Sequence, residues 1–216
     1  SEGSYHKDDI PEESESVMIA ERTMKKFNVP GEQIEIIVKA INSLYMEGAA
    51  RNELTDIIHD ADFLSKSGPL GIGEFFVKGA VRGDNLINRL INSASKELTY
   101  SENMASNMRT SSGRGMAKKD KSFTRKFFRT LFADLKKKGI TDLVIGERKV
   151  VTEKCKKQIK VITVSERACG NCGKKTDFKT SFESGLKCEK LILTLFCPEC
   201  DKELREISFC LPEICF

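Results

Sequence analysis

The stretch DIIHDADFLSKSGPLGIGEFF, residues 56–76, decides how the first part of the chain folds. Apolar residues recur within it and just before it at intervals of three and four, which predicts a helix with one face towards a core. That face consists of Leu54, Ile57, Ile58, Ala61 and Leu64. Gly68-Pro69 then turns the chain into a further helix, Leu70–Val81. The stretch therefore predicts two helices joined by a tight turn.

Four side chains of this stretch are candidates for a functional site: Asp56, His59, Asp60 and Asp62. Asp62 follows Ile58 by one helical turn and so lies at the edge of the apolar face, where a carboxylate is costly unless it is paired or binds a metal. An N-cap or a buried ion pair is the alternative interpretation of Asp62. Asp60 lies about 200° away around the helix and is expected to point elsewhere. Asp56, His59 and Asp60 share another face at i, i+3 and i+4, which permits a makeshift metal site.

The sequence pattern changes from helical to strand-like near Gly139–Gly146. Helical patterns predict helices at Glu12–Phe27, Gly31–Tyr45, Arg51–Lys66, Leu70–Val81, from Leu86 onwards, and Gly115–Lys138. The last of these is expected to turn to the core a stripe of residues four apart: Phe123, Phe127, Leu131 and Leu135. Strand patterns begin after Gly139, at residues 143–145, 149–151, 158–165, 191–196 and 203–209. The prediction is an α+β fold, with a helical domain at residues 1–140 and a small β-rich domain at residues 141–216.

Composition narrows the class of protein. The 216 residues carry a net charge of +4, which is too small to indicate a partner by itself. No apolar run approaches the roughly 20 residues that cross a bilayer, and the polar, acidic start is not a signal peptide, so no membrane partner is expected. Eight cysteines without a secretory signal indicate a reducing, cytoplasmic compartment with some thiols bound to metal.

The most specific motif is a pair of Cys-x-x-Cys knuckles, Cys169–Cys172 and Cys197–Cys200, with residues 173–196 between them. That separation is long enough for a hairpin to bring the pairs together. Zinc binds four thiolates in a tetrahedron, and the two-residue spacing lets one tight turn supply two of them. The four cysteines Cys169, Cys172, Cys197 and Cys200 therefore predict a zinc ribbon, with a structural Zn²⁺ and no open position for catalysis. A redox dithiol or free core cysteines are the alternatives, although a redox motif would occur once, at a helix start.

The other four cysteines lack knuckle spacing. Cys188 and Cys210 are expected in the core or in strands, and no role is assigned to Cys155 and Cys215. A second metal bound by this set is the less favoured alternative.

Zinc ribbons bind nucleic acid, bind protein or hold a domain together. The predicted long helix also has basic residues around the sides that its apolar stripe leaves free: Arg114, Lys118, Lys119, Lys121, Arg125, Lys126, Arg129, Lys136, Lys137 and Lys138. A solvated face is the preferred interpretation of these charges. Phosphate-bearing ligands or RNA are the alternative.

Residues Ile10–Lys138 resemble the C-terminal part of the HD-domain metal-dependent phosphohydrolases. Two segments carry most of the resemblance, Asp60–Leu64 and Gly68–Ile72, which match the Asp-Ala-Asp segment and the Gly-x-x-Gly-Ile turn of one branch. Weaker matches are Glu12, Ser14, Thr110, Gly113, Arg114, Met116, Ala117 and Phe123.

This resemblance implies hydrolysis of a phosphorylated small molecule or nucleotide, assisted by a divalent metal on histidines and aspartates. Asp62 matches the family's last metal-ligand aspartate, whereas the His59-Asp60 dipeptide falls on the Asp-Ala-Asp segment and is interpreted as coincidental; His59 and Asp60 are secondary candidates. The family's His-Asp pair would precede residue 1. Departures from the branch pattern are Ile10 and Leu44 in place of histidines, Ser65 in place of an aspartate and Glu74 in place of an arginine.

Two hypotheses follow from the sequence. The first is an HD-type phosphohydrolase-like protein, truncated or inactive, with a second divalent metal at Asp62. The second is a non-catalytic zinc-ribbon binding or scaffold protein that contacts nucleic acid or a protein partner.

Overall fold

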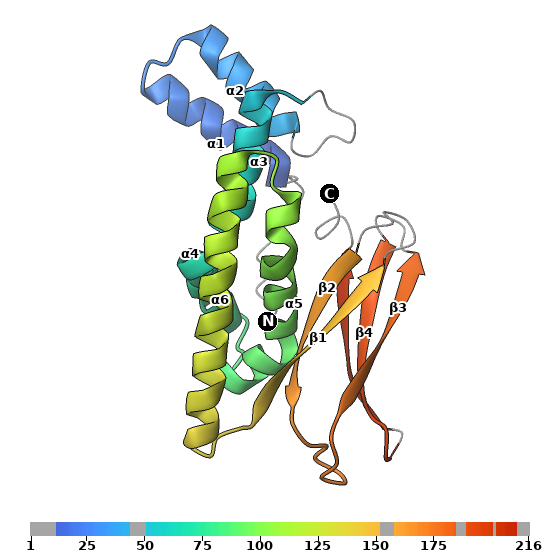
Figure 1. Cartoon of the computed structure of the whole chain (residues 1–216). Coiled ribbons are helices and arrows are strands. Elements are labelled where there is room, and N and C mark those ends of the chain that lie inside the picture. The colour runs from blue at the N-terminus through green and yellow to red at the C-terminus, as the bar shows by residue number, and fades with distance from the viewer. Residues whose placement is uncertain (1–11, 44–50, 152–157, 185–188, 201, 211–216) are drawn as a thin grey trace. The chain divides into compact units, whose positions relative to one another are not determined.

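The computed structural model describes residues 12–43, 51–151, 158–184, 189–200 and 202–210. This part of the chain forms six helices followed by five strands (Figure 1). The predicted α+β fold, with helices first and strands after residue 140, is confirmed. The chain divides into two compact units, residues 1–63 and 64–216. Residue 140 marks the change from helix to strand, and the units divide earlier, between Phe63 and Leu64.

The first unit contains α1 (Glu12–Lys26), α2 (Gly31–Ser43) and most of α3 (Glu53–Ser65). The apolar face predicted for α3 is wrong, because Ile57 is 50% exposed and the buried residues of the helix are Thr55, His59 and Asp60. Polar side chains can be buried when they find hydrogen-bond partners, and these do so close by in the sequence. Thr55 exchanges hydrogen bonds with Asn52, and His59 contacts Asp60.

The second unit begins with three helices, α4 (Gly68–Val81), α5 (Leu86–Asn107) and α6 (Ser111–Lys137). The stripe predicted for α6 is right in part: Leu135 is buried and Phe127 and Leu131 pack against the core, but Phe123 is 44% exposed. The buried positions of the helix are Gly113, Ala117, Thr124, Phe128, Phe132 and Leu135. A strict four-residue repeat drifts by about 40° per step around an α-helix, whereas alternating intervals of three and four stay on one side. No helix among the described residues is long and apolar enough to cross a membrane.

The turn between α3 and α4 depends on two close backbone approaches. Gly68 has φ +60°, and a Cβ there would lie 2.6 Å from Oδ1 of Asp120 on α6. Ser67 donates a hydrogen bond to the other carboxylate oxygen of Asp120. At Gly71 a Cβ would lie 2.3 Å from the carbonyl oxygen of Lys66. The Gly-x-x-Gly spacing is therefore required by packing at this turn.

The strands form two antiparallel sheets. β1 (Leu143–Val151) pairs with β2 (Gln158–Glu166), and β3 (Asp177–Ser184), β4 (Glu189–Cys197) and β5 (Lys202–Cys210) form a sheet in the order β3-β4-β5. β3 was not among the predicted strands. The even-numbered residues Ile162 and Val164 of β2 join the helical core, and the odd-numbered Ile159 and Val161 join the core of the three-stranded sheet. β2 is therefore buried on both faces between the helices and the second sheet.

A stripe of polar side chains on α5 hydrogen-bonds the edge of β2 that β1 leaves free. Ser95 accepts from the N–H of Val164 at 2.8 Å, and Thr99 accepts from the N–H of Ile162 at 3.0 Å. One turn later, Asn103 accepts from the N–H of Lys160 and donates to its carbonyl oxygen. Three side chains spaced by four thus satisfy alternate backbone groups of the strand, as a further strand would do. Figure 1 shows α5 between α6 and β2.

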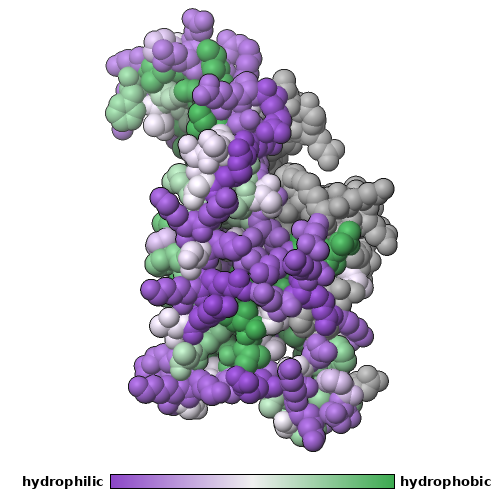
Figure 2. All heavy atoms as spheres, in the orientation of Figure 1, coloured by the Kyte–Doolittle hydropathy of each residue, from purple (hydrophilic) through white to green (hydrophobic). Residues whose placement is uncertain are grey.

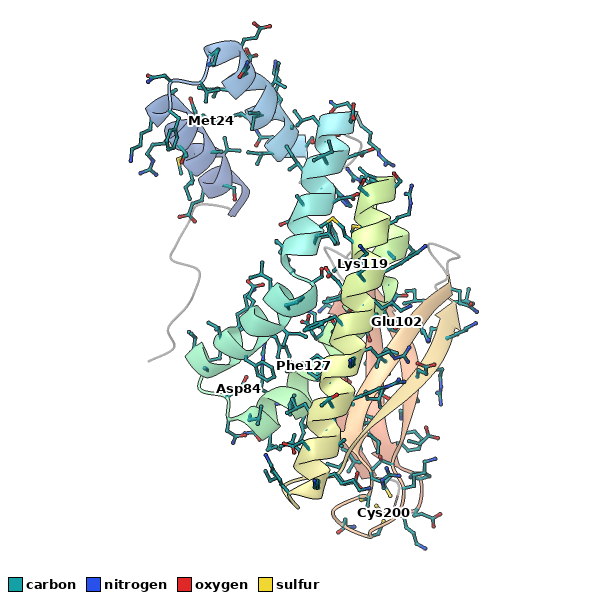
Figure 3. All side chains as sticks on the ribbon, turned by 60° about the vertical axis from the view of Figure 1, so that its left-hand side comes forward. Met24, Asp84, Glu102, Lys119, Phe127 and Cys200 are labelled. Atoms are coloured by element: carbon teal, nitrogen blue, oxygen red, sulfur yellow. The ribbon has the colours of Figure 1, made fainter. Side chains whose placement is uncertain are left out.

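A charge network joins these elements beside α5. The carboxylate of Glu102, labelled in Figure 3, lies 2.8 Å from Lys121 of α6 and 3.1 Å from Lys160 of β2. Burial raises the pKa of Glu102, but the hydrogen bonds from these lysines outweigh it and leave the pKa below its ordinary value. Glu147 of β1 contacts Lys160 and Arg125 of α6, and Arg125 also lies 3.5 Å from Glu102. Glu102 and Glu147 therefore share the cations Lys160 and Arg125.

Candidate functional site

The four knuckle cysteines come together as predicted. Their Sγ atoms all lie within 4.8 Å of one another, although the two knuckles are separated by a whole hairpin in the sequence. The Sγ atoms of Cys169 and Cys200 are 3.8 Å apart, and those of Cys172 and Cys197 are 3.4 Å apart. Each of these pairs joins one knuckle to the other.

The first knuckle is a tight backbone turn that precedes β3. The N–H of Cys169 donates to the carbonyl of Lys174 at 2.7 Å, and the N–H of Gly173 donates back to the carbonyl of Cys169 at 2.8 Å. Gly173 has φ +71°, a conformation that favours glycine. A β-bridge between Ala168 and Lys175 closes the base of the turn. No side-chain pattern in the sequence indicates that bridge, because only backbone groups form it.

The sheet supplies the second knuckle at the same end. Cys197 is the last residue of β4, and Cys200 precedes β5, so the second knuckle is the connection between these strands. Asp177, the first residue of β3, pairs with Phe196, which places the start of β3 beside the end of β4. Figure 3 shows Cys200 in the connections at this end of the strands. The β3–β4 hairpin therefore brings the two knuckles together, as the sequence predicted.

The thiols of this cluster have unequal proton affinities. Backbone N–H groups of Asn171 and Cys172 donate to the sulfur of Cys169 and lower the pKa of that thiol to about 7. At Cys172 an N–H from Lys174 favours the thiolate, but the neighbouring cysteine thiols outweigh it and raise the pKa to about 12. A metal cation among the sulfurs would reverse that rise, because a coordinating thiol is deprotonated.

The geometry of the cluster fits a tetrahedral metal. A metal–sulfur distance of about 2.3 Å implies sulfur–sulfur separations of about 3.8 Å in a tetrahedron. The separations of 3.8 and 3.4 Å between the sulfur atoms are close to this value and too long for disulfide bonds. Cys169 and Cys197 are buried, Cys200 is partly buried and Cys172 is exposed. The four residues could therefore hold one metal ion at the end of the sheet.

The candidates on α3 are placed differently from the prediction. Asp60, which was expected to point away, is buried with His59, and His59 Nδ1 lies 3.0 Å from Asp60 Oδ1. The imidazole ring also lies 4.7 Å from the ring of Phe63, centroid to centroid. Asp62 is partly buried. Across the described ranges, His59, Asp60 and Asp62 do not form a group of three potential metal ligands, whereas the four cysteines do.

Of the other cysteines, Cys210 lies in a strand, as predicted, at the end of β5. The predictions for Cys155, Cys188 and Cys215 concern residues outside the described part of the chain. Ile10 and Leu44, the departures from the family pattern, lie outside it as well.

Comparisons with known proteins do not assign the chain to a family. No protein-family model matches the chain, and no curated protein matches it. Among solved structures, Bacillus subtilis YpgQ in complex with ADP is similar, with a TM-score of 0.43 and 20% identity over 55% of this chain and 61% of that one. Another crystal structure of YpgQ has a TM-score of 0.42 and 18% identity. The chain spans about three fifths of the length of YpgQ, and at these TM-scores the likeness assigns the chain to no family.

Proposed function

We propose that the chain is a non-catalytic binding module whose C-terminal sheet is stabilised by one Zn²⁺ on Cys169, Cys172, Cys197 and Cys200. The observation that supports this proposal is the convergence of the four Sγ atoms within 4.8 Å. Zinc prefers four thiolates in a closed tetrahedral site, and such a site leaves no coordination position for water or substrate. The metal therefore has a structural role.

The role of zinc follows from the place of the cluster. It joins the loop before β3 to the connection between β4 and β5, two segments that the β3–β4 hairpin separates in the sequence. A metal there holds the end of a three-stranded sheet whose core is small, with Leu191, Leu193 and Ile207 among its buried residues. Binding energy of the metal adds directly to folding energy at such a site. The sheet then presents a fixed surface to a nucleic acid or a protein partner.

A second candidate function is metal-dependent hydrolysis of a phosphorylated small molecule or nucleotide. The observation that favours it is the buried His59–Asp60 pair on α3, with Asp62 two residues further on. A buried imidazole–carboxylate pair is a common support for a metal or a reacting group. In this case Asp62 would hold a second divalent metal, as the HD-domain resemblance implies.

Metal analysis of the purified protein tests the first candidate. We expect about one zinc per chain, and we expect Cys169→Ser to lose it. Cys210→Ser is the matched control, because Cys210 lies in β5 away from either knuckle motif, and it should keep the zinc. Protein that carries no zinc and keeps its fold in a strong chelator would refute the structural site.

Phosphatase assays with Mn²⁺, Co²⁺ and Ni²⁺ separate the two candidates. The non-catalytic proposal predicts little or no turnover of a generic phosphate ester. Robust turnover that Asp62→Ala abolishes, with zinc content unchanged, would establish the second candidate instead.

A further inference from the structure

A cavity of about 1120 Å³ lies beside the first knuckle in the second unit. Its walls come from the C-terminal half of α6, from β1, from the end of β2 and from the loop that leads into β3. Typical small-molecule sites enclose about 300–1,000 Å³, so this hollow is large enough for an extended ligand. The walls are held in place by the β1–β2 pairing and by the Ala168–Lys175 bridge.

Positive charge gathers in this cavity from several elements. Five cationic residues line it, against three carboxylates: Arg129, Lys136, Arg148, Arg167 and Lys175 against Asp142, Glu147 and Asp177. They come from α6, β1 and both sides of the first knuckle, so the sequence does not group them. Like charges that face one another across a concave wall focus their field and attract an anion more strongly than charges spread over a convex surface.

The carboxylates in the cavity already form ion pairs with cations of the protein. Glu147 contacts Arg125 and Lys160, two cations that do not line the cavity. Asp142 lies 2.9 Å from both Lys136 and Arg167, and hydrogen bonds from Lys136 and Arg167 hold its pKa below the ordinary value.

Two of the cations that line the cavity do not take part in such ion pairs. Neither Arg129 nor Lys175 forms an ion pair with another residue in the described ranges. The guanidinium of Arg167 has five N–H donors, and the hydrogen bond to Asp142 uses the one on Nε. The cavity therefore has donors and positive charge in excess of what its own carboxylates satisfy.

The lining indicates phosphate recognition more than base recognition. Phe132 is the aromatic residue of the lining, and it is 4% exposed, so it offers no stacking surface. Stacking platforms for bases need exposed aromatic rings, whereas phosphates are bound by arginine and lysine alone. Figure 2 shows that hydrophilic side chains cover much of the visible face.

We infer that this cavity binds a ligand that carries several phosphate groups, with Arg129 and Lys175 as its principal contacts. The inference rests on the proposed function, because the zinc-bound knuckle would fix Lys175 at the cavity wall. Two kinds of ligand carry such phosphate groups: a nucleic-acid strand, through its backbone, and a free nucleoside polyphosphate.

Fluorescence anisotropy with a short fluorescein-labelled oligouridylate, measured over a salt series, tests the inference. The double variant Arg129→Gln/Lys175→Gln should raise the Kd by about tenfold or more, since each lost contact is a charged hydrogen bond. The slope of log K against log salt should become shallower by about 1.4, the value for two lost phosphate contacts on a single strand. Lys118→Gln/Lys126→Gln is the matched control. Both lysines are exposed on α6, the helix that carries Arg129, and neither lines the cavity.

Isothermal titration with ATP distinguishes the two sources. Binding of the oligonucleotide that depends on Arg129 and Lys175 identifies a strand, and binding of ATP alone with the same dependence identifies a free nucleotide. The inference is overturned if neither probe binds, or if the control variant weakens binding as much as the cavity variant does. Zinc content is measured for every variant. Zinc-loaded protein that binds neither probe refutes this inference alone, and phosphate binding by zinc-free, folded protein refutes the structural zinc site alone.

Discussion

Replacing Thr99 by valine tests whether the polar stripe of α5 acts as a substitute strand for β2. The side chain is 0% exposed, and its hydroxyl accepts from the N–H of Ile162 at 3.0 Å and lies 3.2 Å from the carbonyl oxygen of the same residue. Valine has nearly the same shape, so the change removes both hydrogen bonds and leaves little cavity. The backbone N–H of Ile162 then has no partner on that edge.

The cost follows from the burial of these groups. Leaving a buried donor without a partner costs about 1–3 kcal/mol of unfolding free energy. We therefore expect Thr99→Val to destabilise the protein by about 2 kcal/mol, which lowers the melting temperature by roughly 4–8 °C for a unit of this size. Ser95→Ala removes one hydrogen bond, to the N–H of Val164, and should cost less.

Urea unfolding followed by circular dichroism measures the free energy, and native-state hydrogen exchange supplies a local readout at the amide of Ile162. That amide should exchange faster in Thr99→Val than in the wild type. Thr130→Val, at an exposed position of α6, is the control and should change stability by no more than about 0.5 kcal/mol. If Thr99→Val matches this control in stability and leaves the exchange of Ile162 unchanged, α5 does not serve as the partner of β2.

Two further predictions concern α4 and α5. Gly71→Ala should destabilise the protein by about 1–3 kcal/mol, because the new Cβ would meet the backbone carbonyl of Lys66, which cannot move aside. Gly73→Ala on the same helix meets nothing within 4 Å and should stabilise by about 0.5–1 kcal/mol; thermal melts that rank the two variants the other way would contradict this packing. Burial raises the pKa of Glu97 from 4.5 to about 7, so the folded state holds its proton more tightly than the unfolded state. The resulting stabilisation is fully present below pH 4.5 and is lost as the pH rises through 7. Glu97→Gln should therefore be more stable than the wild type at pH 8, by up to about 3 kcal/mol, and equal to it near pH 4; an advantage that does not depend on pH would exclude this cause.

Local patterns in the sequence predicted the helix order and the cluster of four cysteines well. Gly68-Pro69 and Gly139 mark real ends of helices, and the two knuckles required nothing beyond the hairpin between them to meet. Both features depend on residues that are near in sequence or on a spacing that permits one tight turn. Such local signals can be interpreted without knowing the rest of the fold.

The parts that the sequence did not predict depend on contacts between distant residues. Nothing near Ser95, Thr99 or Asn103 indicates that their partners lie in a strand more than 50 residues further on. The buried face of α3 is polar because His59 and Asp60 hydrogen-bond each other, so the spacing of its apolar residues indicates the wrong side of the helix. The cavity cations likewise come from separate elements that converge only in the folded second unit.

X-ray absorption at the zinc K-edge of the purified protein tests the central claim most directly. Coordination by Cys169, Cys172, Cys197 and Cys200 predicts a single shell of four sulfur atoms at about 2.3 Å from the metal. A shell that contains nitrogen or oxygen at about 2.0 Å, or fewer than four sulfur atoms, would contradict a closed four-cysteine site.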